Sequence, residues 1–157
     1  MSTVSLATLD ATDRRLLALL QEDSSRTNEA LARAVHISPA TCLRRVRRLV
    51  ESGVIERQMA VVSPDALAGL TAILEVTLDV QSAEAQTTFE ALIAPDPMVQ
   101  QCYRVATGPD FVLVVYVLEM SSYHAFVHRT LTAANNVRNV RSFFSVKRVK
   151  FAPALPV

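Results

Sequence analysis

The segment SPATCLRRVRRLVESGVI, residues 38–55, decides the fold of the first third of this chain. Ser38 followed by Pro39 predicts the start of a helix, because serine caps free amide groups and proline at the first helical position loses no hydrogen bond. Gly53 predicts the end of the same helix, since glycine readily adopts the left-handed conformation that follows many helices. We therefore predict a helix over residues 39–52.

Two shorter helices are predicted before it. Asp10 is the expected cap of the first, which carries leucines at helical spacing. Thr27 is the expected cap of the second, over residues 28–35, and the tight connection at 36–37 leads into the helix over 39–52. Two helices joined by a short turn and preceded by a third helix make the helix-turn-helix pattern.

The predicted helix over 39–52 has two unlike sides when its residues are placed about 100° apart. One side is apolar and is expected to be core: Leu43, Val46, Leu49 and Val50. The opposite side holds Thr41, Arg44, Arg45 and Arg48, with Arg47 at its flank. Like charges repel on a free helix, so a partner that neutralises them is the economical explanation, and a merely solvated basic face is the alternative.

Double-stranded DNA fits this basic side. In a major groove the start of the helix would lie near base edges, and its arginines would reach phosphates or guanines. Residues 54–62 are rich in β-forming side chains and are expected to form a small hairpin, or wing, beside the DNA. The predicted DNA-binding residues are Ser38, Pro39, Ala40, Thr41, Arg44, Arg45, Arg47, Arg48 and Arg57.

The rest of the chain predicts a second domain. We expect a first domain over residues 1–62, a linker over 63–70 and a second domain over 71–157. Its elements read β-α-β-β-α-β, with strands at 71–80, 99–106, 111–118 and 137–149, one helix from Ser82 to about 93 and another from Ser121 or Ser122 to about 133. This order is the ferredoxin-like plan, so the predicted fold class is α+β. Apolar residues on the sheet face without helices predict an oligomer.

Composition excludes several classes of function. Three glycines among 157 residues leave no glycine-rich phosphate loop. No apolar run is long enough for a membrane helix, and residues 1–13 lack the pattern of a signal peptide, so we expect a cytoplasmic protein without a membrane partner. The two cysteines, Cys42 and Cys102, are expected to be buried and reduced. His124 and His128 are expected to be surface residues, so no metal site and no catalytic residue is predicted.

Charge is sorted along the chain. The net charge is +2 over residues 1–60, −7 over 61–120 and +6 over 121–157, although the whole chain carries only +1. Residues 33–57 contain six arginines against two glutamates. Because the local sign governs attraction to phosphate, this balance favours nucleic acid as the partner of the first domain. The basic last third is expected to offset the acidic middle.

Several motifs together resemble the Lrp/AsnC family. They are Leu9-Asp10-x-x-Asp13-x-x-Leu16-Leu17, Leu31-Ala32, Ile37-Ser38-Pro39-x-x-Cys42-Leu43-x-Arg45-Val46-Arg47-Arg48-Leu49, Gly53-Val54-Ile55, Asp110-Phe111 and Met120-Ser121-Ser122-Tyr123. The family comprises bacterial and archaeal feast/famine transcriptional regulators. The resemblance implies a winged helix-turn-helix joined to a ligand-sensing ferredoxin-like domain, dimers formed through the sheets and often assembled into octamers, and an amino-acid effector bound between dimers.

The resemblance also implies where the effector binds, near the turn that joins the second and third strands of the sensing domain. The corresponding residues are Tyr103, Arg104, Thr107, Gly108, Asp110 and Thr132. Members usually have two residues between the glycine and the aspartate, whereas only Pro109 lies between them here. The turn could present backbone amides to a carboxylate while Asp110 holds an amine, or Gly-Pro-Asp could simply be a good turn.

The predicted function is that of a sequence-specific DNA-binding regulator whose homo-oligomer is modulated by an amino acid or a similar small effector. It is not predicted to be an enzyme or to hold a cofactor. Two alternatives stay open. Siroheme decarboxylase subunits resemble the same two-domain plan, although they have no need of an arginine-dense third helix. An architectural DNA-binding protein would bind many sequences equally and ignore amino acids.

Overall fold

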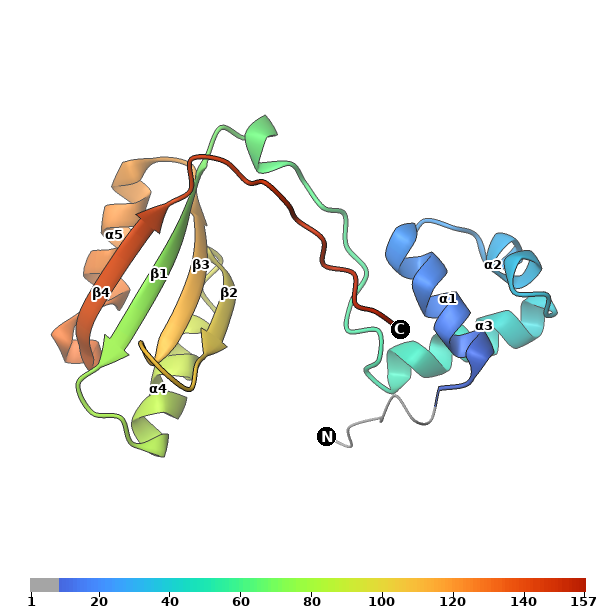
Figure 1. The fold of residues 1–157 in the computed structure, drawn as a ribbon, viewed down its shortest axis with the longest axis horizontal. Helices are drawn as coiled ribbons and strands as arrows, with labels where there is room; N and C mark the ends of the chain where they lie inside the picture. The colour runs from blue at the N-terminus through green and yellow to red at the C-terminus, as the bar shows by residue number, and fades with distance from the viewer. Residues whose placement is uncertain (1–8) are drawn as a thin grey trace. The chain divides into compact units, whose positions relative to one another are not determined.

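The computed structural model describes residues 9–157 and divides them into two units (Figure 1). The first contains the described residues up to Val61 together with Lys150–Val157, and the second contains Val62–Val149. Residues 1–8 of the predicted first domain lie outside the described part. The division differs from the predicted one at the C-terminus, because residues 150–157 group with the first unit. One contact there joins the Gln21 side chain to the backbone of Leu155, at 2.7 and 3.0 Å.

Three helices form the first unit: α1 (Ala11–Glu22), α2 (Asn28–Ala34) and α3 (Pro39–Glu51). The predicted caps are confirmed, since Asp10, Thr27 and Ser38 each accept a backbone N–H from the first turn of their helix. Gly53 follows α3 with φ +74°, the left-handed conformation that only glycine adopts without strain. Local capping chemistry therefore sets the limits of all three helices.

The core of the first unit corrects the predicted inner side of α3. Cys42 and Leu49 are buried and Val46 is partly buried, whereas Leu43 is 42% exposed and Val50 is 49% exposed. The prediction of Leu43 and Val50 as core residues is wrong. The buried stripe follows positions 42, 46 and 49, and each of the two exposed side chains lies one residue, about 100°, further round the helix.

The predicted β-hairpin after α3 is also wrong. Residues 54–62 contain no strand. Ile55 packs on the helical core and donates its N–H to the carbonyl of Leu49, and the residues after it are exposed. The segment has no glycine, proline, asparagine or aspartate that could make a tight hairpin turn, so its β-forming residues stay unpaired.

The second unit confirms the β-α-β-β-α-β order. Its elements are β1 (Leu70–Leu78), α4 (Ala83–Ile93), β2 (Val99–Arg104), β3 (Phe111–Val117), α5 (Met120–Thr130) and β4 (Val137–Phe144), with short 3-10 turns at Pro64–Ala66 and Ala133–Asn135. The strands lie in the order β2-β3-β1-β4, and every neighbouring pair is antiparallel. This is the ferredoxin-like arrangement, with β1 and β3 in the centre.

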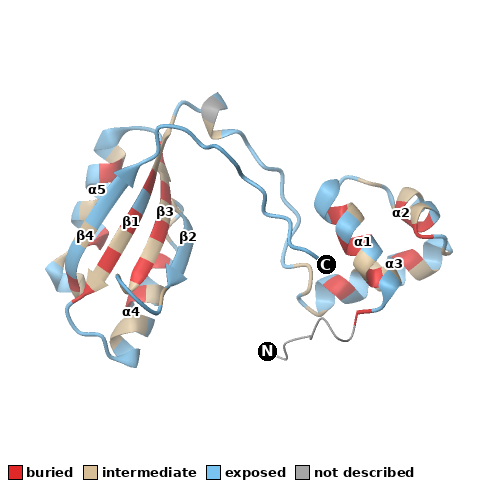
Figure 2. Ribbon diagram, in the orientation of Figure 1, coloured by how far each residue is buried: buried red, intermediate tan, exposed pale blue. Residues whose placement is uncertain are grey.

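The two central strands alternate in burial (Figure 2). The even-numbered residues of β1 from 72 to 78 and the odd-numbered residues of β3 from 111 to 117 are buried under α4 and α5. Phe89 of α4 and Phe126 of α5 complete this core. The other face of the sheet is uncovered in the single chain, and apolar side chains such as Ile73 and Phe143 are exposed. The core therefore lies on one side of the sheet only.

Two boundaries differ from the predicted ones. Helix α5 begins at Met120 after Glu119, whose carbonyl accepts the N–H of Tyr123, so the predicted serine cap is wrong. Strand β4 ends at Phe144, opposite Ala72 of β1, rather than at 149. One more backbone hydrogen bond follows, from the N–H of Ser145 to the carbonyl of Thr71, and β1 itself begins at Leu70.

The two cysteines differ in environment. Cys42 is fully buried, as predicted, and burial raises the pKa of its thiol. Cys102 lies on the edge strand β2 and is exposed, so its predicted burial is wrong. An edge strand has a neighbour on one side only, which leaves its side chains more open than those of β1 or β3.

The predicted balance of charge between the middle and the last third is confirmed within the second unit. Arg141 on β4 pairs with Glu75 on β1 at 3.2 Å, and Arg129 on α5 pairs with Asp96. Both pairs join a base of the last third to an acid of the middle. The sorted charges therefore meet across neighbouring elements.

Candidate nucleic-acid interface and effector turn

The four arginines of α3 divide between two sides of the helix. Arg45 and Arg48 reach acids at the start of α1. Arg44 and Arg47 lie on the side that faces away from the other helices and are exposed. Residues three or four apart share a helix face, so Arg48, three residues after Arg45 and four after Arg44, lies between the two sides: it reaches Asp13 and also borders the groove beside Arg44 and Arg47.

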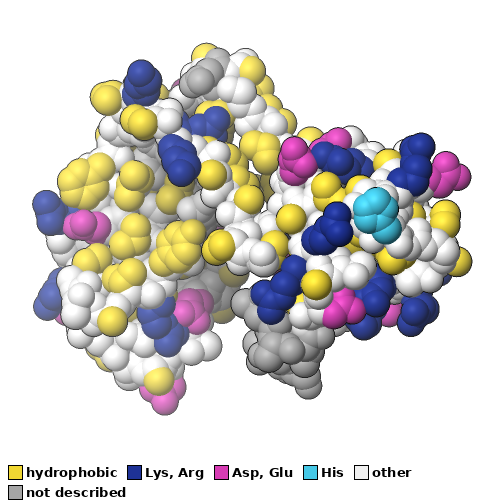
Figure 3. All heavy atoms as spheres, turned by 45° about the vertical axis from the view of Figure 1, so that its right-hand side comes forward, with side chains coloured by type: hydrophobic (Ala, Val, Ile, Leu, Met, Phe, Trp, Pro, Cys, Tyr) yellow, Lys and Arg dark blue, Asp and Glu magenta, His cyan; other side chains and the backbone are white. Residues whose placement is uncertain are grey.

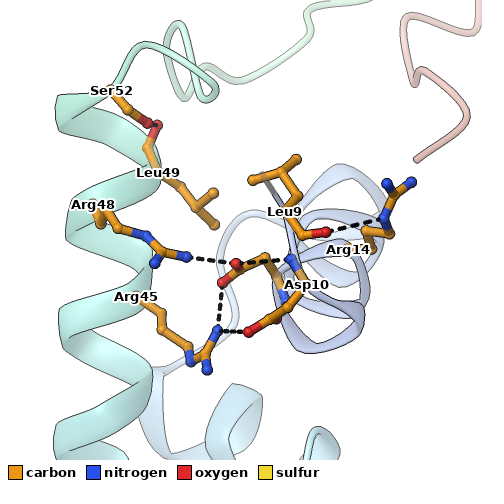
Figure 4. A network of polar contacts seen from close by, with 8 residues as sticks. Leu9, Asp10, Arg14, Arg45, Arg48, Leu49 and Ser52 are labelled. Carbon is orange, nitrogen blue, oxygen red and sulfur yellow. Dashed lines mark hydrogen bonds and ion pairs between the residues drawn. The ribbon is translucent and has the colours of Figure 1, made fainter. Parts of the chain in front are cut away.

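The inward pair binds one buried carboxylate. The Asp13 side chain is only 1% exposed and accepts hydrogen bonds from Arg45 Nη1 at 2.9 Å and Arg48 Nη2 at 2.5 Å. Arg45 Nη1 also donates to Asp10 at 2.6 Å (Figure 4). A buried carboxylate needs such partners, because an unpaired charge away from water is strongly unfavourable. The network joins α3 to the first turn of α1.

The same network shifts two pKa values. The backbone N–H of Asp13 and the guanidinium of Arg45 lower the pKa of Asp10 below its ordinary value. Hydrogen bonds to Asp10 and Asp13 raise the pKa of Arg45. Each shift favours the charged form, so the ion pairs are maintained at neutral pH.

The outward side of α3 is an open groove of about 480 Å³. We call it the open face, and it is lined by Ala40, Leu43, Arg44, Arg47, Arg48 and Glu51. Among residues 9–157, neither Arg44 nor Arg47 forms an ion pair, and both guanidinium groups are available to an anion. Figure 3 shows arginine side chains over the helix-turn-helix unit with apolar atoms between them.

The predicted DNA-binding residues therefore fall into separate groups. Ala40, Arg44, Arg47 and part of Arg48 come together on the open face. Ser38 caps the helix start by accepting the N–H of Thr41 at 3.2 Å, and the hydroxyl oxygens of the two residues lie 2.8 Å apart. Pro39 occupies the first turn. Arg45 is turned toward α1, and Arg57 lies on the extended segment after α3, 3.4 Å from Glu56.

Sequence reasoning missed two features of this region. Leu43 belongs to the open face, although its apolar character suggested the core. Asp13 was noted only as part of the motif at the start of α1, yet it holds Arg45 and Arg48 from more than thirty residues away. The available signal was the recurrence of two acids at the start of α1 and arginines three apart in α3.

The turn between β2 and β3 is fixed by Asp110. Its carboxylate accepts the N–H of Leu78 at 2.7 Å and the side-chain amide of Gln81 at 3.1 Å. Its own N–H donates to the carbonyl of Val76 at 2.9 Å. Gly108 has φ +89° in the middle of the turn. Asp110 thus attaches the turn to the end of β1.

The other predicted effector residues lie at the same end of the sheet. Thr132 accepts the N–H of Val137, the first residue of β4, which pairs with the last residue of β1. Arg104 ends β2, pairs with Glu90 at 2.6 Å and lies 6.0 Å from the ring centre of Phe111. Tyr103 and Thr107 are exposed. Tyr103 and Arg104 are successive residues of β2, so their side chains point to opposite faces of the sheet. The set therefore lies near the C-terminal end of β1 but is divided between the two faces.

Within the described residues, no group of three or more His, Cys, Asp or Glu is arranged to hold a metal ion. His124 and His128 are exposed on α5. In the same part of the chain, every helix is too short or too polar to pass through a bilayer.

Comparison with known proteins places these features in one family. Residues 9–56 match the winged helix-turn-helix DNA-binding family, and residues 71–155 match the Lrp/AsnC ligand binding domain. The chain belongs to the Lrp/AsnC family. This Lrp/AsnC protein is therefore a transcriptional regulator with a DNA-binding domain and a domain of the amino-acid-binding type.

Curated relatives and solved structures cover almost the whole Lrp/AsnC chain. It is 39% identical over 145 residues to the leucine-responsive regulatory protein of Rhizobium meliloti, covering 92% of this chain and 93% of that protein. It is 31% identical over 150 residues to the DNA-binding transcriptional activator DecR of Escherichia coli, covering 95% and 99%. A transcriptional regulator of Neisseria meningitidis, solved as an L-Met complex, has a TM-score of 0.84 at 32% identity and covers 95% and 97%.

Proposed function

We propose that this Lrp/AsnC protein binds duplex DNA through the open face of α3 and alters its regulatory output when an amino acid binds at the β2–β3 turn. One observation carries the DNA-binding part of the proposal. Arg44 and Arg47 lie exposed on one side of α3 without an acidic partner among the described residues, while Arg45 and Arg48 are held by Asp13. Helix α3 is therefore fixed to α1 through Arg45 and Arg48, and its open face is basic.

This division assigns different work to the arginines. Arg44 and Arg47 reach phosphate oxygens or guanine edges, because a planar guanidinium binds both with two parallel hydrogen bonds. Arg45 positions the helix through Asp10 and Asp13, and Arg48, which is 55% exposed, keeps donors for DNA beside its bond to Asp13. The start of α3 lies nearest the base edges and includes Ser38, Pro39, Ala40 and Thr41. Arg57 contacts the phosphate backbone of the DNA beside the groove.

The effector belongs to the amino-acid class. The ligand-binding family of the second unit and the L-Met complex of the Neisseria relative support this assignment. The predicted set, Tyr103, Arg104, Thr107, Gly108, Asp110 and Thr132, supplies donors and acceptors at one end of the sheet. Asp110 holds the turn through Leu78 and Gln81, so its first task is to shape the site.

The working form is a homodimer that assembles further, to an octamer, in the cytoplasm. The uncovered sheet face supports this proposal, because apolar side chains at Ile73, Tyr103 and Phe143 would otherwise remain in water. The protein acts by binding and not by catalysis. The names of its relatives, which are transcriptional regulators, support that reading.

Selection of genomic DNA tests the proposed function. The purified chain is mixed with genomic duplex fragments at low ionic strength, with and without pooled amino acids, and the bound fragments are sequenced. We expect a defined set of fragments that changes when amino acids are present. Recovery of all fragments equally would favour the architectural alternative, and a red-absorbing tetrapyrrole in the purified protein would favour the enzyme.

The Arg44→Ala/Arg47→Ala double variant makes the selection specific to the open face. It is expected to lose most of the DNA binding and to keep its helical circular dichroism, because neither arginine supports the core. Retention of full binding by this variant would contradict the placement of DNA on the open face.

A further inference from the structure

Leu43 exposes a large apolar side chain on the face that carries free arginines. It is 42% exposed and lines the open face together with Ala40, Arg44 and Arg47. Ala40 is exposed as well, one turn before Leu43. The packing of α3 does not require Leu43, because the core contacts of the helix are made by Cys42, Val46 and Leu49.

The surroundings of Leu43 indicate what covers it. Arg44 and Arg47 lie on the same face and attract phosphate, so the polyanion that binds them also lies against Leu43. The floor of a major groove offers one methyl group, the C5-methyl of thymine, and the polar atoms at the base edges are hydrogen-bond donors and acceptors. An apolar side chain pressed against any other base edge would leave a donor or acceptor unpaired.

The geometry points to Leu43, with Ala40 beside it, as the residue that selects thymine at the base pairs under the open face. The inference rests on the proposed function and adds to it a sequence preference. The two Cα atoms are separated by about 4.5 Å along the helix axis, since each residue advances the helix by roughly 1.5 Å. That separation is close to the spacing of about 3.4 Å between successive bases. The contacted thymines are therefore adjacent or nearly so.

Removal of single methyl groups from the DNA tests this reading. A fragment is first selected from a random-sequence duplex pool by the full-length protein, and each thymine is then replaced in turn by deoxyuridine, which lacks only the methyl group. Fluorescence anisotropy measures the Kd of each probe. For the wild-type chain, we expect one or two positions at which the change weakens binding about fourfold, the effect of one buried methyl group.

Variants of the protein show whether Leu43 is the residue that contacts the methyl group. Leu43→Ala should bind the thymine and deoxyuridine probes equally at those positions, because the side chain that contacts the methyl group is gone. Leu43→Met should retain the difference, since methionine keeps an apolar side chain of similar volume. Val50→Ala is the matched control: Val50 is also an exposed apolar residue of α3, 49% exposed, but it does not line the open face. It should behave as the wild type.

The outcomes separate this inference from the proposed function. If the wild-type chain tolerates every deoxyuridine, or if Leu43→Ala still distinguishes the two probes, the reading of thymine by Leu43 is wrong while DNA binding stands. If no duplex is retained at low ionic strength, the proposed function fails and the inference fails with it. Circular dichroism of each variant confirms that a loss of discrimination occurs in a folded protein.

Discussion

Asp13→Asn tests the network that holds α3 in place. The substitution keeps the size of the side chain but removes its charge and turns an amide donor toward two guanidinium groups. The bond to Arg45, 22% exposed, contributes about 2 kcal/mol as a charge-assisted hydrogen bond in a partly buried setting. The bond to Arg48, 55% exposed, adds no more than about 1 kcal/mol because solvent screens it. We expect the free energy of unfolding of the first unit to fall by about 3 kcal/mol.

Hydrogen exchange followed by mass spectrometry measures this loss within the full chain. Amides in the buried parts of α1 and α3 should exchange roughly 100-fold faster in Asp13→Asn, the factor that corresponds to about 3 kcal/mol. Amides of the second unit should be unchanged. Glu22→Gln is the matched control, because Glu22 is an exposed acid of the same helix that pairs with Arg26 at 2.7 Å. It should accelerate exchange about twofold or less.

A result in which Asp13→Asn and Glu22→Gln behave alike would refute the reasoning. It would mean that the buried carboxylate contributes no more than a surface pair, and that α3 is held by its apolar contacts alone. Faster exchange in the second unit as well would show that the two units do not unfold independently, and the local interpretation would then be wrong.

Three further predictions concern the interface, the turn and pH. Arg47→Ala should lower the slope of log Kd against log salt by roughly 0.9 if Arg47 contacts one phosphate, as salt titration of DNA binding will show. Asp110→Ala should destabilise the second unit by about 1–2 kcal/mol in thermal melts, because the N–H of Leu78 loses its acceptor. The folded-state pKa of Asp10 lies below its ordinary value of 3.8. The contribution of Asp10 to stability is therefore complete above pH 3.8 and is lost as the pH falls through the lowered pKa. Asp10→Asn should remove this pH dependence of stability in acid titrations.

Each of these has a contrary outcome. An unchanged salt slope would remove Arg47 from the phosphate contacts. A second unit as stable in Asp110→Ala as in the wild type would leave the turn to be shaped by Gly108 alone. Equal acid sensitivity of Asp10→Asn and the wild type would assign the titration to another carboxylate.

Local chemistry explains what the sequence could predict. The helix limits depend on a cap and the residues three or four positions away, so Asp10, Thr27, Ser38 and Gly53 could be recognised without the structure. The strand over 71–80 followed from the alternation of apolar and polar residues, and the β-α-β-β-α-β order of elements indicated the ferredoxin-like plan. The basic character of α3 and the exposure of Ala40 and Arg44 were also accessible in this way.

Contacts between distant segments explain what could not be predicted. Which apolar residues of α3 are buried depends on what α1 and α2 place against it, and a helical wheel alone could not assign Leu43 to the open face. The pairing of Arg45 with Asp13 joins residues 32 positions apart. The wing was predicted from β-forming side chains, although pairing also requires a turn that residues 54–62 lack.

Nitrogen-15 spectra of the arginine side chains test the central claim most directly. The Nε–H resonances of the full-length protein are recorded before and after addition of a selected duplex at low ionic strength. The account predicts that the resonances of Arg44 and Arg47 move on binding, while that of Arg45, already held by Asp10 and Asp13, stays in place. Movement of Arg45 with Arg44 and Arg47 unaffected, or no movement of any arginine of α3, would contradict it.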